Sequence, residues 1–208
     1  MRKILTFLII SLSISCFSNN GFSQAKENPF SHNHPKTSLG KLLSAAEEQT
    51  QYTIYYDPSY VKLSYPGGDV PLERGVCSDV VVRALRAIGV DLQKDVHQDM
   101  KANFSLYPKI WGLKQPDPNI DHRRVANLMA YFERKGYSLP ISQNPINYRP
   151  GDIVAWRLDS GLLHIGLVSD LPSYERETYQ IIHNIGAGTK AEAKLFAWKI
   201  IGHYRIFE

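Results

Sequence analysis

The sequence predicts an α+β fold, in which helices come first and an antiparallel sheet follows. Apolar residues recur at helical spacing up to residue 135, whereas from residue 150 they alternate with period two. Turn residues separate the first three strand-like segments, and such short connections favour antiparallel pairing. Helices followed by strands, instead of alternating with them, distinguish α+β from α/β. The 208 residues, 43% hydrophobic and 21% charged, fit one globular domain.

Helices are predicted over three segments, residues 38–49, 77–90 and 121–135. Thr37 or Ser38 can cap the first helix, and Gly89 and Gly136 end the second and third. Asp121 or Asn119 can cap the third helix. Three segments carry no regular pattern: an irregular one rich in Tyr, Pro and Gly (52–72), a mixed one (91–114) and a loop (115–119). Strands are predicted over four segments, residues 152–158, 164–169, 179–185 and 200–207.

The first 25 residues are typical of a bacterial secretory signal peptide. Arg2 and Lys3 precede an apolar stretch over residues 4–14, which is too short to span a bilayer as a helix. We expect cleavage after Ala25, a flexible lead-in over residues 26–37 and a periplasmic or secreted domain over residues 38–208. No stable membrane insertion is expected after cleavage. Lipidation of Cys16 is a competing interpretation with a weaker match.

Signal cleavage changes the charge and the cysteine count. Loss of Arg2 and Lys3 lowers the formal net charge from +4 to +2, which is too small to indicate nucleic-acid binding. Of the two cysteines, Cys16 leaves with the signal peptide. Cys77 then remains as a lone thiol in an exported protein, where an internal disulfide cannot form.

Cys77 stands at the predicted start of a helix. The unpaired N–H groups and partial positive charge of a first helical turn stabilise a thiolate and can hold an oxyanion. Gly75 leaves room for a substrate, whereas the carboxylate of Asp79 in the same turn raises the pKa of the thiol. The alternative is a buried cysteine that packs as a small apolar residue.

A cysteine nucleophile needs a base, and the base needs an orienting group. His164 lies on a predicted strand and shares its face with Gly166. His183 and Asn184 lie on the next strand and point to opposite faces, so only one of them can meet His164. The alternatives are a surface histidine and a polar pair that bonds the backbone at a strand end.

Several motifs together resemble a known family. They are Tyr65-Pro66-Gly67-Gly68, Gly75-Val76-Cys77-Ser78-Asp79, Gly151-Asp152-Ile153-Val154, His164-Ile165-Gly166, Ile182-His183-Asn184, Ile120-Asp121-His122-Arg123-Arg124-Val125 and Gly202-His203-Tyr204-Arg205. Over residues 38–208 the chain resembles the YijF-like family of secreted proteins of unknown function. More broadly, it resembles the NlpC-type, papain-like cysteine peptidases of bacterial cell walls. The resemblance implies a papain-like fold, with the nucleophile helix packed on an antiparallel sheet.

The resemblance also implies roles for individual residues. Cys77 matches the nucleophile, His164 the base and His183 the orienting group, with Asn184 as the fallback. Tyr65 matches a tyrosine that lies beside the nucleophile and helps to bind the oxyanion. The chain departs from the superfamily pattern on both sides of the cysteine, with Val76 in place of Asp and Ser78-Asp79 in place of Ser-Gly.

A second cluster, Asp121-His122-Arg123-Arg124, suits substrate binding together with Asp79. Cations in the first turn of a helix oppose its dipole by about 0.3–1 kcal/mol each, so their presence indicates a use such as gripping a carboxylate. The alternative is an N-cap followed by solvated or paired arginines. A metal site built from His164, His183, His203 and Asp152 has no supporting motif, and neither a metal nor another cofactor is expected.

These observations predict a secreted, monomeric cysteine hydrolase that cleaves an amide bond in peptidoglycan through a thioester. One alternative is a non-catalytic module that binds cell-wall peptides or a protein. Another is a thiol acyltransferase or deamidase with the same triad.

Overall fold

The computed structural model describes residues 34, 36–174 and 178–207. The predicted signal peptide (1–25), Cys16 and most of the lead-in (26–37) therefore lie outside the described residues. No helix within the described ranges is both long and apolar enough to cross a membrane.

Two predicted helices form the centre of the fold, α1 (Ser38–Tyr52) and α2 (Cys77–Arg86). The Thr37 hydroxyl caps α1 by accepting a hydrogen bond from the Gly40 N–H at 3.1 Å, as predicted. The second helix begins at Cys77 as predicted but ends four residues early. Gly89 lies beyond the end of α2, with a φ of 86°.

The region after α2 differs from the prediction. A further helix, α3 (Leu92–Asn103), begins at an Asp91 cap and is followed by the short 3-10 helix η1 (Phe104–Leu106). The helix predicted over 121–135 is two elements, the 3-10 helix η2 (Asp121–Arg123) and α4 (Val125–Arg134). Arg124 interrupts them with extended backbone, φ −100° and ψ 114°. A third 3-10 turn, η3 (Pro145–Asn147), precedes the sheet.

The C-terminal half forms an antiparallel sheet of five strands. The strands are β3 (Ile153–Arg157), β4 (Leu163–Pro172), β5 (Tyr179–Asn184), β6 (Thr189–Glu192) and β7 (Lys199–Tyr204). Their order is β6-β5-β4-β3-β7, and every neighbouring pair is antiparallel, so the α+β prediction is confirmed. Of the five strands in this sheet, β6 alone was not predicted, because its sequence Thr-Lys-Ala-Glu has no apolar alternation.

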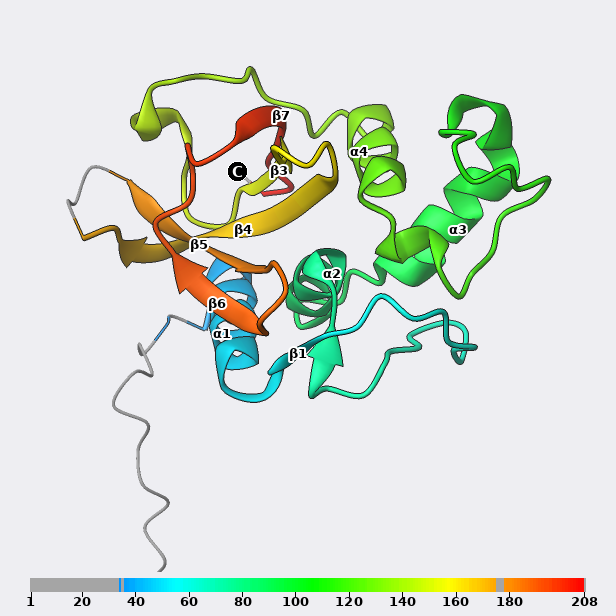
Figure 1. Ribbon diagram of the computed structural model, residues 1–208, viewed down its shortest axis with the longest axis horizontal. Coiled ribbons are helices and arrows are strands. Elements are labelled where there is room, and N and C mark those ends of the chain that lie inside the picture. The colour runs from blue at the N-terminus through cyan, green and yellow to red at the C-terminus, as the bar shows by residue number, and fades with distance from the viewer. Residues whose placement is uncertain (1–33, 35, 175–177, 208) are drawn as a thin grey trace, which may run out of the picture. The chain divides into compact units, whose positions relative to one another are not determined.

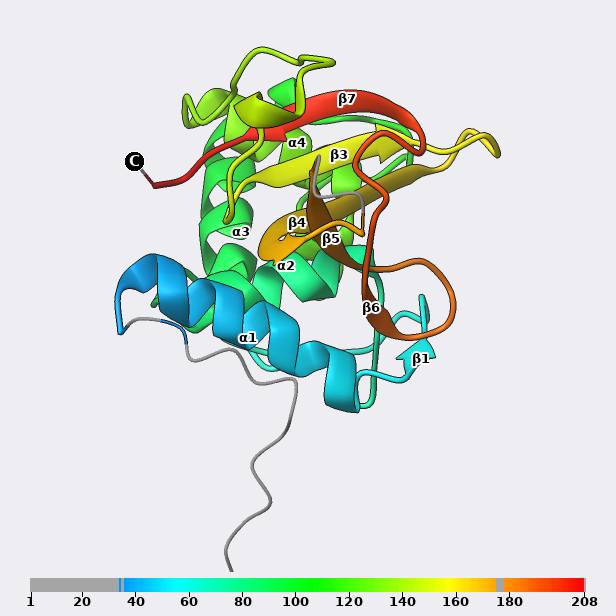
Figure 2. The ribbon, with the colours of Figure 1, turned by 90° about the vertical axis from the view of Figure 1, so that its left-hand side faces the viewer.

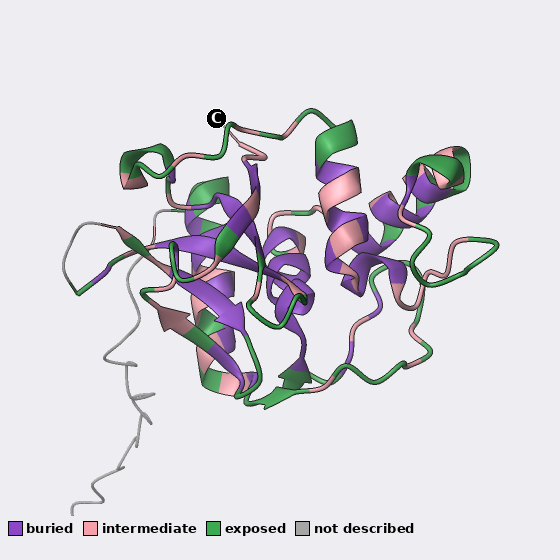
Figure 3. Cartoon of the chain, turned by 45° about the horizontal axis from the view of Figure 1, so that its top comes forward, coloured by how far each residue is buried: buried purple, intermediate pink, exposed green. Residues whose placement is uncertain are grey.

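Helices α1 and α2 cover one face of the sheet (Figures 1 and 2). Ile153, Ile165 and Leu167 on that face join the apolar residues of α1 and α2 in the main core, and α2 is buried along almost all of its length (Figure 3). A second core on the opposite face contains Tyr148, Val154, Trp156, Val168, Ile181, Leu195 and Ile200. The alternation of the strands therefore separates two environments, and the position of a side chain along its strand decides which one it enters.

Arg83 of α2 anchors the irregular segment that leads into Cys77. Its guanidinium is buried and donates two hydrogen bonds to Asp69, at 2.9 and 3.0 Å. It also donates to Thr53 Oγ1 and to the carbonyl of Arg74, both at 3.0 Å. These bonds hold the segment that precedes Cys77, residues 69–74, against the middle of α2.

Candidate active site

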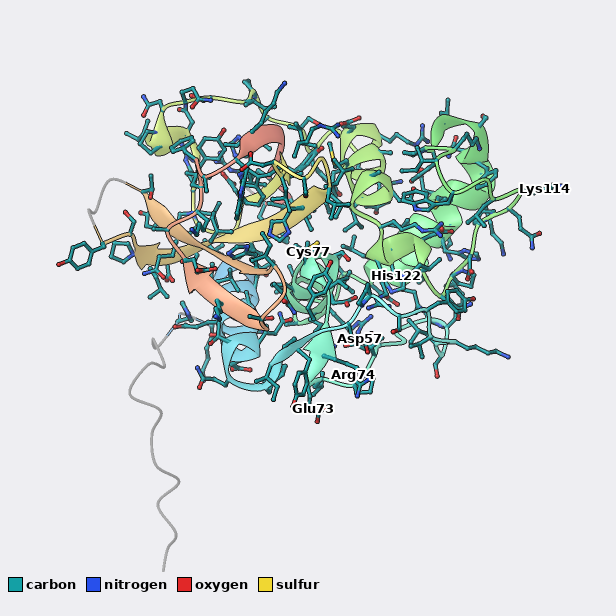
Figure 4. The ribbon with its side chains drawn as sticks, in the orientation of Figure 1. Asp57, Glu73, Arg74, Cys77, Lys114 and His122 are labelled. Atoms are coloured by element: carbon teal, nitrogen blue, oxygen red, sulfur yellow. The ribbon has the colours of Figure 1, made fainter. Side chains whose placement is uncertain are left out.

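Two short parallel strands, β1 (Tyr55–Tyr56) and β2 (Arg74–Gly75), place Cys77. Gly75 pairs with Tyr56, and Val76 continues as extended backbone before α2 begins. The Asp79 N–H donates to the Val76 carbonyl at 3.1 Å, whereas the Val76 side chain has no acceptor, so the N–H groups of Cys77 and Ser78 can meet the thiol or a ligand. Figure 4 shows Cys77 at the start of α2, between this helix and the sheet.

Glycine is needed at position 75 because the Asp79 side chain folds back against the residues before the helix. The carboxylate of Asp79 accepts a hydrogen bond from the Val76 N–H at 2.7 Å. A Cβ atom on Gly75 would lie 3.2 Å from the Cβ of Asp79. Asn184 reinforces this turn, since its side-chain amide donates to the carbonyls of Gly75 and Tyr55 at 3.1 and 3.2 Å. Asn184 is therefore a structural tie and not the orienting group of His164.

The Cys77 side chain is buried, and burial raises the pKa of its thiol to about 11. The backbone N–H groups of Ile165, Ser78 and Cys77 itself act in the opposite direction, while the charge of Asp79 adds to the increase. The expectation that Asp79 opposes ionisation is confirmed. Burial therefore outweighs the stabilisation of a thiolate that the helix N-terminus offers.

The thiol lies at the edge of β4, beside the peptide bond between His164 and Ile165. Val168 donates its N–H to Asp152 on the β3 side at 2.8 Å. Alternation turns the N–H of Ile165 to the other side, toward β5. The pairing of β5 with β4 ends at Leu167–Ile182, before it reaches Ile165. The N–H of Ile165 therefore faces the thiol of Cys77.

His164 and His183 form a hydrogen-bonded pair that continues to Glu192. Nε2 of His164 lies 2.7 Å from Nδ1 of His183, and Nε2 of His183 lies 3.1 Å from Oε2 of Glu192. A carboxylate only accepts, so His183 carries its proton on Nε2 and accepts from the Nε2–H of His164 through Nδ1. This assignment leaves Nδ1 of His164 unprotonated, as a general base requires. Glu192 was missed in the sequence because it lies on the unpredicted strand β6.

Both imidazoles are neutral at pH 7. Burial first, and the charge of His183 second, lower the pKa of His164 to about 3. Burial also lowers the pKa of His183, although Glu192 acts against it. The ring of His164 lies 5.8 Å from those of Trp156 and Trp198, on the sheet face opposite α2.

The structure therefore joins two members of the predicted triad, His164 and His183, and among its described residues shows no contact between Cys77 and either imidazole. His183 meets His164 as predicted, and Cys77 lies beside the backbone that follows His164. Within the described part of the chain, no hydrogen bond joins the thiol to the imidazole. The two groups are neighbours across one peptide bond, and they lie toward opposite faces of the sheet.

Cys77 opens onto a pocket of about 620 Å³. Its walls are mainly apolar and come from four parts of the chain: Tyr56, Pro58, Val76, Pro108, Ile110, Trp111, Ile120, Arg123, Val125, Ala126, Arg157, Gly161, Leu162 and Leu163. The tyrosine in this wall is Tyr56, whose pKa is raised by burial and then by the charge of Cys77. Tyr65 packs its ring against His97 of α3, with centroids 5.1 Å apart, and is not among the residues that line this pocket.

The predicted substrate-binding residues form mostly structural contacts. Asp79 and Arg123 are a buried pair joined by two hydrogen bonds, each 2.9 Å long. Arg124 contacts Asp121 at 3.3 Å and lies over the ring of Trp111. The Asp121 side chain is buried, which raises its pKa to about 6. Asp79, Asp121 and Arg123 are thus occupied within the protein, which corrects their predicted role as a free grip.

His122 is the remaining member of this cluster. Burial lowers its pKa to about 4, and its Nδ1 is buried without a hydrogen-bond partner. His122 is not among the residues that line the pocket.

The pair formed by Asp152 and His203 lies apart from the thiol. Asp152 accepts hydrogen bonds from His203 at 2.8 Å and from Arg205 at 2.7 and 2.8 Å. Burial alone would raise the pKa of Asp152, but these bonds outweigh it and the pKa is lowered. In the described ranges, no group of three or more His, Cys, Asp or Glu side chains is arranged to hold a metal ion.

Comparison with known proteins identifies the family. Residues 43–206 match the family described as Domain of unknown function (DUF1287). The chain belongs to the DUF1287 family. It is 58% identical over 167 residues to the uncharacterized protein YijF of Escherichia coli (strain K12), a match that covers 80% of each protein. The DUF1287 region contains Cys77, His164, His183 and Glu192, so every group of the candidate site lies within it.

Proposed function

We propose that this DUF1287 protein is a cysteine hydrolase that cleaves an amide bond in a peptide. The observation that carries the proposal is the hydrogen-bonded chain from Glu192 through His183 to His164, together with the thiol of Cys77 beside the Ile165 N–H that follows His164. The carboxylate of Glu192, 3.1 Å from His183, fixes the tautomer of both neutral histidines. They are suited to present one basic nitrogen.

The reaction begins with a neutral thiol. As the sulfur attacks the amide carbon, the thiol proton passes to Nδ1 of His164 through a bound water or after rotation of the histidine ring, and the carbonyl π electrons move to the oxygen. The N–H groups at the start of α2 stabilise this oxyanion, and the Tyr56 hydroxyl lies in the same wall of the pocket. His164 then protonates the leaving amine as the C–N bond breaks, which leaves a thioester on Cys77. A water molecule, deprotonated by His164, hydrolyses the thioester and restores the thiol.

The resemblance to NlpC-type peptidases supports a papain-like assignment and a cell-wall substrate. A nucleophile helix packed on an antiparallel sheet is present here, with the histidines on adjacent strands. We propose peptidoglycan stem peptides as the substrate class and a periplasmic or secreted location, in accord with the predicted signal peptide.

The proposal is tested by digestion of purified sacculi with the wild-type protein and with Cys77→Ala. Mass spectrometry of the released muropeptides should show new amine and carboxylate termini with the wild-type protein alone. The far-UV circular dichroism of Cys77→Ala should match that of the wild type. Equal cleavage by both proteins would contradict the proposal.

One observation favours a second function, a binding module without catalysis. The buried thiol with a pKa of about 11 is poorly reactive in the resting state. A module predicts that sacculi are retained by the protein while no bond is cut. Transfer of the acyl group to an amine instead of water would identify the acyltransferase alternative in the same digestion.

A further inference from the structure

The pocket above Cys77 contains an arginine without an acidic partner. Arg123 also lines this pocket, but its charge is matched by Asp79. Arg157 at the end of β3 is exposed and donates to the carbonyl of Gly161 at 3.3 Å. In the described part of the chain, no carboxylate forms an ion pair with Arg157. An unpaired guanidinium in an otherwise apolar wall favours an anionic ligand.

A second hollow continues from the first. It has a volume of about 390 Å³ and shares four lining residues with the Cys77 pocket: Pro108, Ala126, Arg157 and Leu163. Arg157 therefore stands on the boundary between the two hollows. Together they form a groove that runs from the thiol past Arg157 and along α4.

The far hollow contains a charge of the opposite sign. Glu133 of α4 is exposed and lines it, beside Met129 and Ala130. Among the residues that the structure describes, its Oε1 accepts a hydrogen bond from the Tyr204 hydroxyl alone, at 3.4 Å. A positively charged group can therefore reach this carboxylate.

From this order of groups we infer that the groove binds a peptide carrying a carboxylate at Arg157 and, farther from the scissile amide, a free amine at Glu133. This inference rests on the proposed function for the position of the scissile bond. Apolar walls contact the chain between the charges. A fatty acyl chain fits the walls but offers nothing to Glu133, and therefore a peptide is favoured. Arg157 thus has the carboxylate-gripping role that the sequence had suggested for Arg123 and Arg124.

The test measures binding to Cys77→Ala, so that hydrolysis does not interfere. The probe is the tripeptide amide N-acetyl-L-alanyl-γ-D-glutamyl-L-lysinamide, whose charged groups are the α-carboxylate of the glutamyl residue and the side-chain amine of the lysine. One analogue has the α-carboxylate as an amide, and another has the amine acetylated. Each lost charge should weaken binding about tenfold, as expected for a charge-assisted hydrogen bond.

Matched variants assign each charge to its partner. In a Cys77→Ala/Arg157→Gln protein, the amidated analogue and the parent peptide should bind equally. In a Cys77→Ala/Glu133→Gln protein, the acetylated analogue and the parent should bind equally. Arg157→Lys should recover part of the affinity for the parent, since it restores the charge but not the planar fork.

The outcomes separate this inference from the proposed function. Binding that is unaffected by both modifications, or preferred binding of a fatty acyl probe such as N-lauroyl-alanine, would overturn the inference even if the wild-type protein cleaves sacculi. Charge-dependent binding without cleavage by the wild type would support the groove and contradict the hydrolase.

Discussion

Replacement of Asp79 by Asn should strongly destabilise the protein, because it leaves Arg123 buried without a counter-charge. The two side chains are only 4% and 2% exposed and lie 2.9 Å apart. The same carboxylate accepts from the N–H of Val76 at 2.7 Å. Removal of one member of a buried ion pair costs about 3–5 kcal/mol, and we expect a loss of this size in the free energy of unfolding. Urea denaturation followed by circular dichroism measures it.

A double-mutant cycle isolates the pair. Asp79→Asn combined with Arg123→Met should cost at least about 1 kcal/mol less than the sum of the single changes, because no unpaired charge is then left buried. Asp57→Asn is the matched control, since Asp57 pairs with the half-exposed Arg74, and the urea midpoint should stay unchanged. Additive costs in the cycle, or an unchanged midpoint for Asp79→Asn, would refute this account of the ion pair. Asp79→Asn should also lower the pKa of the Cys77 thiol, because the Asp79 charge raises it.

Three further predictions concern the histidine pair. Glu192→Leu should lower the rate of hydrolysis by about 10² or more, because the tautomer of His183 is then no longer fixed. Glu192→Gln should retain more activity, since its amide oxygen can still accept the hydrogen bond from His183. Equal rates for the two variants would count against the tautomer argument. Gly166→Ala should cost about 1–3 kcal/mol of stability by urea denaturation, because its Cβ would lie 2.7 Å from Ile181 Cγ2 and 3.1 Å from the Cβ of His183; a stability equal to that of the wild type would show that the strands yield freely. Stability should fall as the pH drops from about 6.5 toward 3, since His164 becomes protonated in the unfolded chain in that window but not in the folded chain. The slope of the free energy of unfolding against pH should be smaller for His164→Gln. An equal slope would exclude His164 as a source of the pH dependence.

The sequence predicted most of the secondary structure that surrounds the site. Strong apolar periodicity marks the region of α2, which begins at Cys77 as predicted. It also marks the strands that bear His164 and His183, which are adjacent in the sheet. Helix α3 was missed although Leu92, Val96 and Met100 recur at helical spacing, because this apolar stripe is narrow and the buried residues beside it, Gln93 and His97, are polar.

Electrostatic roles were harder to predict than positions. The opposed charges of Asp79 and Arg123 lie 44 residues apart in sequence, and only the packing of η2 against α2 joins them. A helix N-terminus predicts a lowered thiol pKa, but burial is a tertiary property that no local pattern reveals. For the same reason, the unpaired Arg157 could not be distinguished from other arginines in the sequence.

The central claim is that Cys77 forms a covalent bond to the acyl half of an amide substrate. Intact-protein mass spectrometry of a rapidly quenched reaction with muropeptides measures this directly. We predict a mass increase equal to the acyl fragment, localised to Cys77 by peptide mapping and absent from Cys77→Ala. Cleavage of muropeptides that proceeds with no adduct on Cys77, and at the same rate in Cys77→Ala, would contradict the account.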